Sequence, residues 1–388
     1  MQSTSRIVIS DDARGRLSFW GGQREVRAKI GNFLMKNLTL KFIDKDKYGD
    51  EIVLWGNGNT FFYYEKTLSY EGIKVKYIVD SINYEKKYIN YKVYHPSILS
   101  KENCVVLIMT TNPNTYNSII KCVLDINPKI KYFLFDEYIL RKNIYTIQKI
   151  SNFFEDNYSK DVYYNVINSR ISCSDIPDSI ISAKSFRYDD GRYFQEARLE
   201  DVIIDAGAFV GDTLEKFIFN HEGTFKKYYA FEPDFRNFHG LNLRKKRLID
   251  EWCLADDAII TIPKCCSNVT GDVMFRSWIK SGVGSSMCHE IEPFDSFVSK
   301  VQSIRLDDFV MDSPVTFIKA DIEGAEFDML KGARDTISRY KPRLAISVYH
   351  NPSDLYRIPM FIKELNIGYK FQFRHYSYGW GDSILYCF

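Results

Sequence analysis

The sequence lacks the features that define several large protein classes. It contains no run of about 18 apolar residues, which argues against a transmembrane helix. Its eight cysteines include no C-x-x-C pair, so a reduced interior fits better than a disulfide framework. The net charge of only +2 gives no electrostatic reason to expect nucleic acid or a membrane as a partner. The first 20 residues, with Asp11, Asp12 and three arginines, contain no apolar signal core. We therefore expect a soluble, cytoplasmic protein.

The chain is long enough for two domains. Its 388 residues exceed the usual size of one hydrophobic core, and its 45% hydrophobic content is ordinary for a globular protein. The patterning predicts four regions. They are an N-terminal tail and helix at 1–48, a Rossmann-like α/β domain of unknown ligand at 49–140, a helical connector at 141–200, and a larger α/β domain at 201–388.

The smaller α/β domain carries half of a dinucleotide-binding pattern. We expect its strands at Ile52–Trp55, Val75–Val79, Val105–Met109 and Tyr132–Phe135. Gly56 and Gly58 follow the first strand, and Asp80 ends the second. The third glycine of the usual G-x-G-x-x-G pattern is replaced by aromatic residues. Two interpretations stay open, a nicotinamide site at Gly56–Thr60 or a plain tight turn between strand and helix.

The strongest motif begins at Val202. A strand of buried type ends in Asp205, and Gly207 and Gly211 then allow a tight turn into a helix. A second strand ends in Glu232, 27 residues after Asp205. This arrangement suits a nucleoside whose ribose hydroxyls bind a carboxylate while its other end meets a helix N-terminus. The spacing G-x-x-x-G favours a ligand with an amine and a carboxylate, such as S-adenosylmethionine (SAM), over a pyrophosphate.

The remaining strands and helices alternate to the end of the larger domain. We expect strands at Ala258–Ile262, Val315–Ala320, Arg343–Val348, Tyr369–Arg374 and Ser383–Phe388, with helices at Thr213–Asn220, Asp234–Arg244 and Ala325–Ile337. The last two strands are joined by a turn-rich stretch instead of a helix. A mostly parallel sheet with an antiparallel last strand is the layout of Rossmann-like class I methyltransferases.

Four motifs resemble one family. Ile204–Thr213, Ala230–Pro233, Phe317–Glu326 and Ala345–His350, in this order, are similar to the FkbM-type SAM-dependent methyltransferases, as is Phe373–Tyr376. The resemblance covers about residues 201–388. It implies a class I methyltransferase fold and O-methylation, often of sugars or polyketide-like alcohols. Ala206 and Ala208 depart from the commoner Val and Asn, and the smaller α/β domain lies outside the resemblance.

The expected SAM site combines both acidic strand ends. Asp205 is expected to receive the methionine ammonium, Glu232 the ribose hydroxyls, and the helix start at Asp212 and Thr213 the methionine carboxylate. Asp212 or Thr213 as a helix cap is the plain alternative, and Asp234 is expected to cap the next helix. A loop at 282–286 is expected to close over the ligand. The residues expected to contact SAM are Asp205, Gly207, Ala208, Phe209, Gly211, Asp212, Thr213, Glu232, Pro233, Cys266 and Ser286.

An acidic cluster follows the fourth strand, and His350 follows the fifth. Asp321, Glu323, Glu326 and His350 are our catalytic candidates, because they sit at the edge where open α/β sheets bind ligands. Three interpretations compete: charges that stabilise a helix start, a general base for a hydroxyl, or a divalent metal held by Asp321 and Glu323. We favour the base over the metal.

The acceptor is expected to be a small molecule or glycan. Candidate substrate-binding residues are Lys319, Arg374, His375 and Tyr376. These features predict a SAM-dependent O-methyltransferase acting on a hydroxyl of a bacterial surface sugar, a nucleotide sugar or a related metabolite. We expect no nucleic-acid partner and no membrane insertion, and a homo-oligomer is an open alternative. The alternatives are a nucleotide-sugar oxidoreductase that uses the Gly56–Thr60 turn and a non-catalytic scaffold with a SAM-binding fold.

Overall fold

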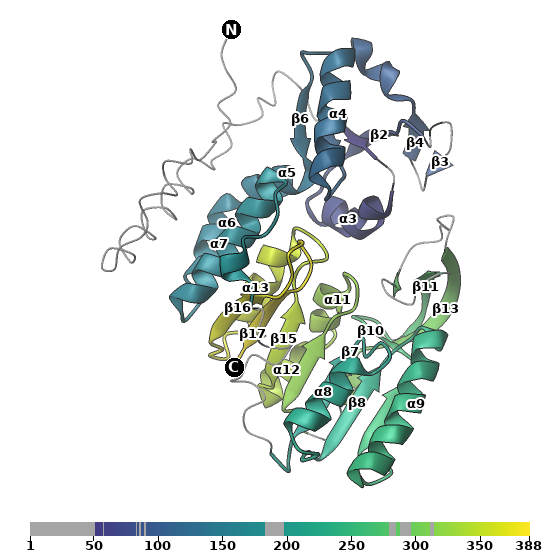
Figure 1. Cartoon of the computed structure of the whole chain (residues 1–388), viewed down its shortest axis with the longest axis vertical. Coiled ribbons are helices and arrows are strands. Elements are labelled where there is room, and N and C mark those ends of the chain that lie inside the picture. Colours follow the sequence, from purple (N-terminus) through teal and green to yellow (C-terminus); the bar gives the residue numbers. More distant parts are fainter. Residues whose placement is uncertain are drawn as a thin grey trace. The chain divides into compact units, whose positions relative to one another are not determined.

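A parallel six-stranded sheet forms the N-terminal part of the computed structural model (Figure 1). The structure describes residues 51–56, 58–82, 84, 87–88, 91–182, 198–278, 285–287, 296–310 and 314–388. The predicted tail and helix at 1–48 lie outside these residues, and all described elements belong to one compact unit, 42–388. Within these described ranges, no helix is long and apolar enough to cross a bilayer.

The N-terminal sheet has the strand order β3-β4-β2-β1-β5-β6. Only β3 runs antiparallel to its neighbour. Its strands are β1 (Ile52–Trp55), β2 (Val75–Val79), β3 (Lys87–Tyr88), β4 (Tyr91–Tyr94), β5 (Val105–Ile108) and β6 (Lys131–Leu134), and its helices are α3 (Asn59–Tyr70), η2 (Pro96–Lys101) and α4 (Pro113–Ile126). Every residue of β5 is buried, as continuous apolar strands covered on both faces are. The four predicted strands are confirmed, and β3 and β4 were not predicted.

The predicted connector is made of packed helices. It contains α6 (Ile144–Ser151), α7 (Asn157–Ser172) and η3 (Asp178–Ile180), whereas α5 (Phe135–Lys142) begins in the predicted α/β domain and ends at its boundary with the connector. Asp156 caps α7 by accepting a hydrogen bond from the Ser159 backbone N–H at 2.7 Å. Phe154 forms a bridge to Phe371, and α7 packs on strand β16 (Phe371–His375) of the C-terminal sheet. The helices therefore cover one edge of that sheet.

The C-terminal sheet has seven strands in the order β16-β17-β15-β14-β7-β8-β9. The strands are β7 (Val202–Ala206), β8 (Lys227–Phe231), β9 (Ile259–Ile262), β14 (Phe317–Ala320), β15 (Arg343–Ser347), β16 and β17 (Ser383–Cys387). The helices are α8 (Asp212–Asn220), α9 (Phe235–Trp252), α10 (Leu306–Phe309), α11 (Glu326–Lys331), α12 (Arg334–Tyr340) and α13 (Asp354–Glu364). Only β17 runs antiparallel to its neighbours, which confirms the predicted α/β class and strand layout.

The helix expected at Ala325–Ile337 is two helices. Gly332 separates α11 from α12, and a Cβ atom there would lie 2.0 Å from the backbone oxygen of Ser267. The chain breaks the helix at this point so that the two backbones can approach. Ser267 lies between the first two strands of a second, smaller sheet.

That smaller sheet was not predicted. Its order is β10-β13-β11-β12, with β10 (Cys265–Cys266), β11 (Gly271–Trp278), β12 (Ser286–Met287) and β13 (Ser296–Ile304). Residues Gly282 to Gly284 of the expected closing loop lie outside the described residues. The sheet brings Cys265, Phe275 and Met287 to the carboxyl edge of the large sheet, where they line a cavity.

Candidate functional site

The first cavity lies at the carboxyl edge of the C-terminal sheet, where the chain order reverses between β7 and its neighbours β14 and β8. Its volume is 240 Å³. Three loops supply most of the wall: Gly207 and Phe209 follow β7, Glu232 and Pro233 follow β8, and Asp321 follows β14. Open α/β sheets bind ligands at this position, so the fold places the predicted motifs together.

Three residues of the loop after β7 have a left-handed backbone conformation. Gly207, Phe209 and Gly211 have φ values of +81°, +51° and +82°. A Cβ atom on Gly207 would lie 2.0 Å from the backbone oxygen of Asp321, so only glycine fits there. Gly211 is the N-cap of α8, and no side chain caps that helix. Asp212 and Thr213 therefore begin the helix, do not cap it, and line the first cavity.

Glu232 is buried, 6% exposed, yet it lines the cavity. Its carboxylate accepts hydrogen bonds from the backbone N–H groups of Phe209 and Asp234, both at 2.9 Å. Burial raises the pKa of Glu232, hydrogen bonding to these N–H groups lowers it, and the balance is a pKa of about 7. The two N–H groups hold the carboxylate in place for a further donor. Asp234 caps α9 as predicted, by accepting from the Arg236 N–H at 2.9 Å.

Asp205 does not face the first cavity, which corrects its expected role as ammonium receptor. It is fully buried, pairs with Lys319 Nζ at 2.8 Å and accepts a hydrogen bond from Tyr228 at 2.8 Å. Lys319 also donates to the Gly207 carbonyl at 2.6 Å. Burial lowers the pKa of Lys319, but Asp205 and Asp321 raise it more, so the lysine stays charged. Breaking one side of such a buried pair costs roughly 3–5 kcal/mol. Lys319 reaches the cavity wall and holds the glycine loop.

Three further expected cofactor contacts are corrected. Gly211 is the N-cap of α8 and does not line the first cavity. Ala208 is 1% exposed and packs in the hydrophobic core with Leu214 and Tyr228 instead of lining the cavity. Ser286 pairs with Arg276 in the small sheet, so its neighbours Ser285 and Met287 line the cavity in its place, as strand alternation requires. The other expected contacts that line the first cavity are Gly207, Phe209, Asp212, Thr213, Glu232, Pro233 and Cys266.

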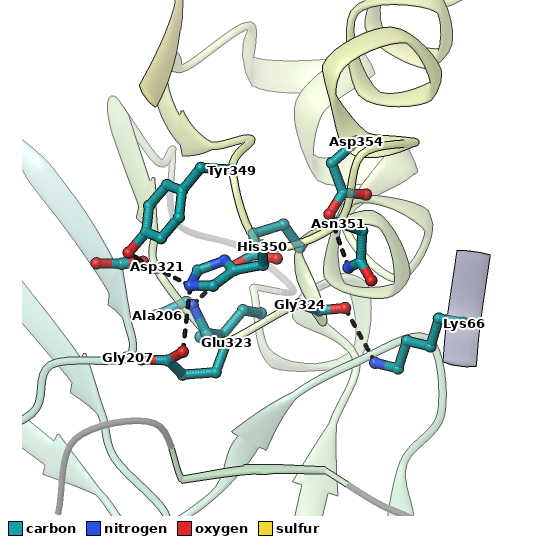
Figure 2. A network of polar contacts seen from close by, with 12 residues as sticks. Lys66, Ala206, Gly207, Asp321, Glu323, Gly324, Tyr349, His350, Asn351 and Asp354 are labelled. Atoms are coloured by element: carbon teal, nitrogen blue, oxygen red, sulfur yellow. Dashed lines mark hydrogen bonds and ion pairs between the residues drawn. The ribbon is translucent and has the colours of Figure 1, made fainter. Parts of the chain in front are cut away.

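Asp321, Glu323, Glu326 and His350 form one cluster, called here the acid–histidine cluster. Figure 2 shows three of its members, Asp321, Glu323 and His350. The Nδ1 atom of His350 is 3.0 Å from Glu326, and its Nε2 atom is 3.2 Å from Glu323 and 3.6 Å from Asp321. Burial lowers the pKa of His350, but Glu326 and Glu323 raise it well above its ordinary value. The ring is therefore an imidazolium held between carboxylates, and it has no free nitrogen with which to accept a proton.

The carboxylates of the cluster differ in what they reach. Glu326 is fully buried and accepts from the Ile322 N–H at 2.8 Å, so it supports the loop and does not face a ligand. Asp321 lines the first cavity and accepts from the Tyr349 hydroxyl at 3.0 Å. Glu323 has a φ of +54°, an unfavourable conformation for a residue with a side chain. Such strain concentrates at functional sites, and Glu323 keeps a quarter of its side chain exposed.

A metal site in this cluster is a weaker interpretation than an ion-paired network. Asp321, Glu326 and His350 each offer one potential ligand atom, and these three atoms lie within 4.8 Å of one another. A histidine binds a metal through a neutral ring nitrogen, whereas both ring nitrogens of His350 face carboxylates. Metal binding would have to displace a proton from that ring.

Three expected substrate residues are corrected, because they line neither cavity. Arg374 donates to the Ser159 hydroxyl at 2.7 Å, and His375 bonds to the Ser383 hydroxyl at 2.8 Å and the Gly379 carbonyl at 3.0 Å. Burial lowers the pKa of His375 to about 4, so it is neutral. The Tyr376 hydroxyl meets that of Tyr386 at 2.7 Å. Their side chains hold the edge strand and its loop together.

Tyr349 was not predicted as a site residue, yet its hydroxyl donates to Asp321 and it lines the first cavity. Its position directly before His350, at the carboxyl end of β15, was a usable signal. Asn237, one turn into α9, was also missed, and its amide donates to Glu232 at 3.4 Å. The hydrogen bonds of Tyr349 to Asp321 and of Asn237 to Glu232 join residues whose sequence spacing does not predict the contact.

The comparisons with known proteins assign one segment of the chain to a family. Residues 205–371 match the family model described as the methyltransferase FkbM domain. This segment is an FkbM methyltransferase domain. The resemblance expected from the four motifs is confirmed for these residues.

Known structures resemble the FkbM domain and the segments around it. The crystal structure of a methyltransferase FkbM from Methylobacillus flagellatus KT is 20% identical, with a TM-score of 0.54, and the match covers 94% of this chain and 99% of that chain. At this identity the likeness shows the fold alone. An rRNA methylase from Streptococcus thermophilus is 14% identical over 53% of this chain and 97% of that one, with a TM-score of 0.32, too low to carry an argument. No protein with a curated function matches the chain.

A second cavity, of 480 Å³, extends beyond the FkbM domain. The domain contributes Glu323, Tyr349 and His350 to it. The remaining wall comes from residues outside the matched segment, which are Tyr64, Thr111, Pro113, Arg170, Ser174, Asp175, Gly379, Trp380 and Gly381. Glu323 and Tyr349 line both cavities.

Proposed function

We propose that the protein is a SAM-dependent O-methyltransferase that acts on a hydroxyl group of a sugar or related metabolite. The observation that carries the proposal is the first cavity at the carboxyl edge of the C-terminal sheet. The loop at Gly207, the buried carboxylate of Glu232 and the partly exposed carboxylate of Glu323 all line it. The FkbM family match supports methyl transfer. The proposed compartment is the cytoplasm, and self-association stays open.

The residues of the first cavity fit SAM. Gly207 leaves room for a ligand beside the backbone, because a side chain there would meet Asp321. Glu232 would accept the ribose hydroxyls, and the α8 N-terminus with Thr213 would face the methionine carboxylate. Cys265 and Cys266, both buried, would offer an apolar wall for adenine. When bound, SAM supplies an electrophilic methyl group.

The chain's own part in the chemistry is to position the acceptor hydroxyl and take its proton. We assign the proton to Glu323, because its carboxylate is partly exposed, lines both cavities and lies 3.2 Å from His350. In methyl transfer the acceptor oxygen would form its new bond to the methyl carbon as the carbon–sulfur bond breaks, SAH would leave, and the hydroxyl proton would pass to Glu323. His350 then acts as a positioning residue, since its imidazolium holds Glu323 and Glu326. A divalent metal is not part of this scheme.

The test is transfer of label from methyl-labelled SAM to a panel of glycosides, sugar phosphates and nucleotide sugars. We expect label on a hydroxyl of at least one of these compounds, with S-adenosylhomocysteine (SAH) as co-product. Full activity after treatment with EDTA is also expected. Reduction of NAD by the same panel, without methyl transfer, would favour the oxidoreductase alternative. Tight SAH binding with no transfer to any compound would favour the scaffold.

The affinity for SAH is expected to rise with pH. Glu232 has a pKa of about 7, and its ionised form accepts hydroxyl hydrogen bonds better than its protonated form does. Calorimetric titrations should therefore show tighter SAH binding at pH 8 than at pH 6. Glu232→Gln should weaken binding by about 10–100-fold at pH 8, the range of a charged hydrogen bond, and remove the pH dependence. An unchanged slope in this variant would show that another group titrates.

A further inference from the structure

We propose that the second cavity is the acceptor site and that it takes an uncharged polyhydroxy compound, such as a glycoside, and excludes phosphorylated sugars. This inference rests on the proposed function, because it needs a methyl donor in the first cavity. It narrows the acceptor class and assigns acceptor recognition to residues outside the FkbM domain. Tyr64, Thr111, Arg170 and Trp380 are the residues concerned.

The shared wall fixes where the acceptor must sit. Glu323 and Tyr349 line both cavities, so a molecule in the second cavity can present a hydroxyl to Glu323 from the side opposite the first cavity. The donor and acceptor then meet at the carboxylate that takes the proton. Substrate and cofactor in separate cavities that share Glu323 and Tyr349 allow the alignment that methyl transfer requires.

Two sheets direct residues to this cavity. Thr111 and Pro113 follow β5, which neighbours β1 at the point where the strand order of the N-terminal sheet reverses. Glu323 and His350 follow β14 and β15 of the C-terminal sheet. Ligand sites of open α/β sheets occur at such carboxyl edges. The N-terminal sheet thus contributes its own ligand-binding edge to the second cavity.

Arg170 supplies a hydrogen-bond donor for a neutral oxygen. It is 2% exposed and lines the second cavity. Its Nε atom pairs with Asp136 at 2.8 Å, and its Nη2 atom donates to the Tyr349 carbonyl at 3.0 Å. Its Nη1 atom is buried and has no hydrogen-bond partner among the described residues. An orphaned buried donor on a cavity wall indicates a missing acceptor, and a sugar hydroxyl or ring oxygen provides one.

Trp380 gives the cavity an aromatic wall. The indole N–H donates to the Ser174 carbonyl at 3.0 Å, and the Arg170 guanidinium lies 5.7 Å from the ring centroid. These contacts tie the 376–382 loop to the end of α7. Aromatic rings offer a large, rigid contact surface to the apolar face of a sugar ring.

The charges around the second cavity oppose a phosphate. Two cations line it, but each is already neutralised: Arg170 by Asp136 and His350 by Glu326. Asp175 and Glu323 then leave the wall net negative. A phosphate or nucleotide would bring negative charge against these carboxylates, whereas a neutral polyol would not.

The experiment uses the full chain, labelled SAM, and matched pairs of methyl glycosides and hexose phosphates. Thr111→Trp fills the second cavity from an exposed position, and Asn117→Trp adds the same bulk to an exposed position of α4 that lines neither cavity. We expect label on a neutral glycoside in preference to its phosphate. Thr111→Trp should raise the KM for that glycoside at least about tenfold, with SAH affinity and kcat nearly unchanged. Asn117→Trp should match the wild type.

The outcomes separate the two proposals. Equal KM values in Thr111→Trp and wild type would overturn the second cavity as acceptor site. Preferential labelling of phosphates, or no labelled glycoside from a protein that binds SAH, would overturn the acceptor class while leaving the donor site intact. Wild-type protein that neither binds SAH nor transfers label would overturn the proposed function, and this inference with it.

Discussion

Glu323→Gln is expected to lower kcat by about 10²–10⁴-fold, the contribution of a positioned general base. A sugar hydroxyl is scarcely ionised at neutral pH, so its proton needs an acceptor as the new bond forms. Gln keeps the size and the +54° backbone conformation of Glu323 but cannot take a proton. Because Glu323 is partly exposed and lies at the shared wall of the two cavities, the variant should fold and bind SAH like the wild type.

Two companion variants sharpen this result. Glu364→Gln makes the same chemical change at an exposed residue that lines neither cavity, and should leave kcat unchanged. His350→Gln should lower kcat less than Glu323→Gln does, because His350 positions Glu323 and does not accept the proton. Steady-state and single-turnover kinetics with labelled SAM provide the measurement. If Glu323→Gln retains full turnover while Asp321→Asn loses it, the base is Asp321.

Gly207→Ala is expected to abolish high-affinity SAH binding, with a loss of about 100-fold or more and a fall in Tm of several degrees. The new Cβ atom would lie 2.0 Å from the Asp321 backbone oxygen, and φ at this position is +81°. Backbone cannot move aside as a flexible side chain does, so the loop after β7 or the loop after β14 must shift. Both loops line the first cavity, so the same shift should lower both the SAH affinity and the Tm.

Gly58→Ala is the matched control for this substitution. Nothing lies within 4 Å of a Cβ atom there, and Gly58 has a φ of −77°. Thermal unfolding and SAH calorimetry should place it near the wild type, within the roughly 1 kcal/mol that an N-cap change costs. SAH affinity equal to that of the wild type in Gly207→Ala would mean that the ligand does not depend on the loop after β7.

Much of the sheet architecture was predictable because buried parallel strands are continuous apolar runs. β1 and β5 are of this type, and each begins where it was expected. The small sheet was missed because β11 mixes polar and apolar residues and pairs with β13 across 17 residues of intervening chain. The partner of such a strand is set by tertiary contacts, which local pattern does not contain.

The site was predictable in its location more than in its roles. Glu232 and Gly207 follow strands whose carboxyl ends must meet, so their positions followed from topology. Asp205 was misassigned because a motif does not reveal that Lys319, 114 positions later, lies beside it in the next strand. Arg374 was misassigned because α7 was predicted only as part of a connector, whereas α7 covers β16 and its Ser159 binds Arg374.

A crystal structure of the protein with SAH tests the central claim most directly. The account predicts SAH in the first cavity, with its ribose hydroxyls within hydrogen-bonding distance of Glu232 and its sulfur facing the side of the cavity that holds Glu323. SAH bound elsewhere, or ribose hydroxyls that do not meet Glu232, would contradict it.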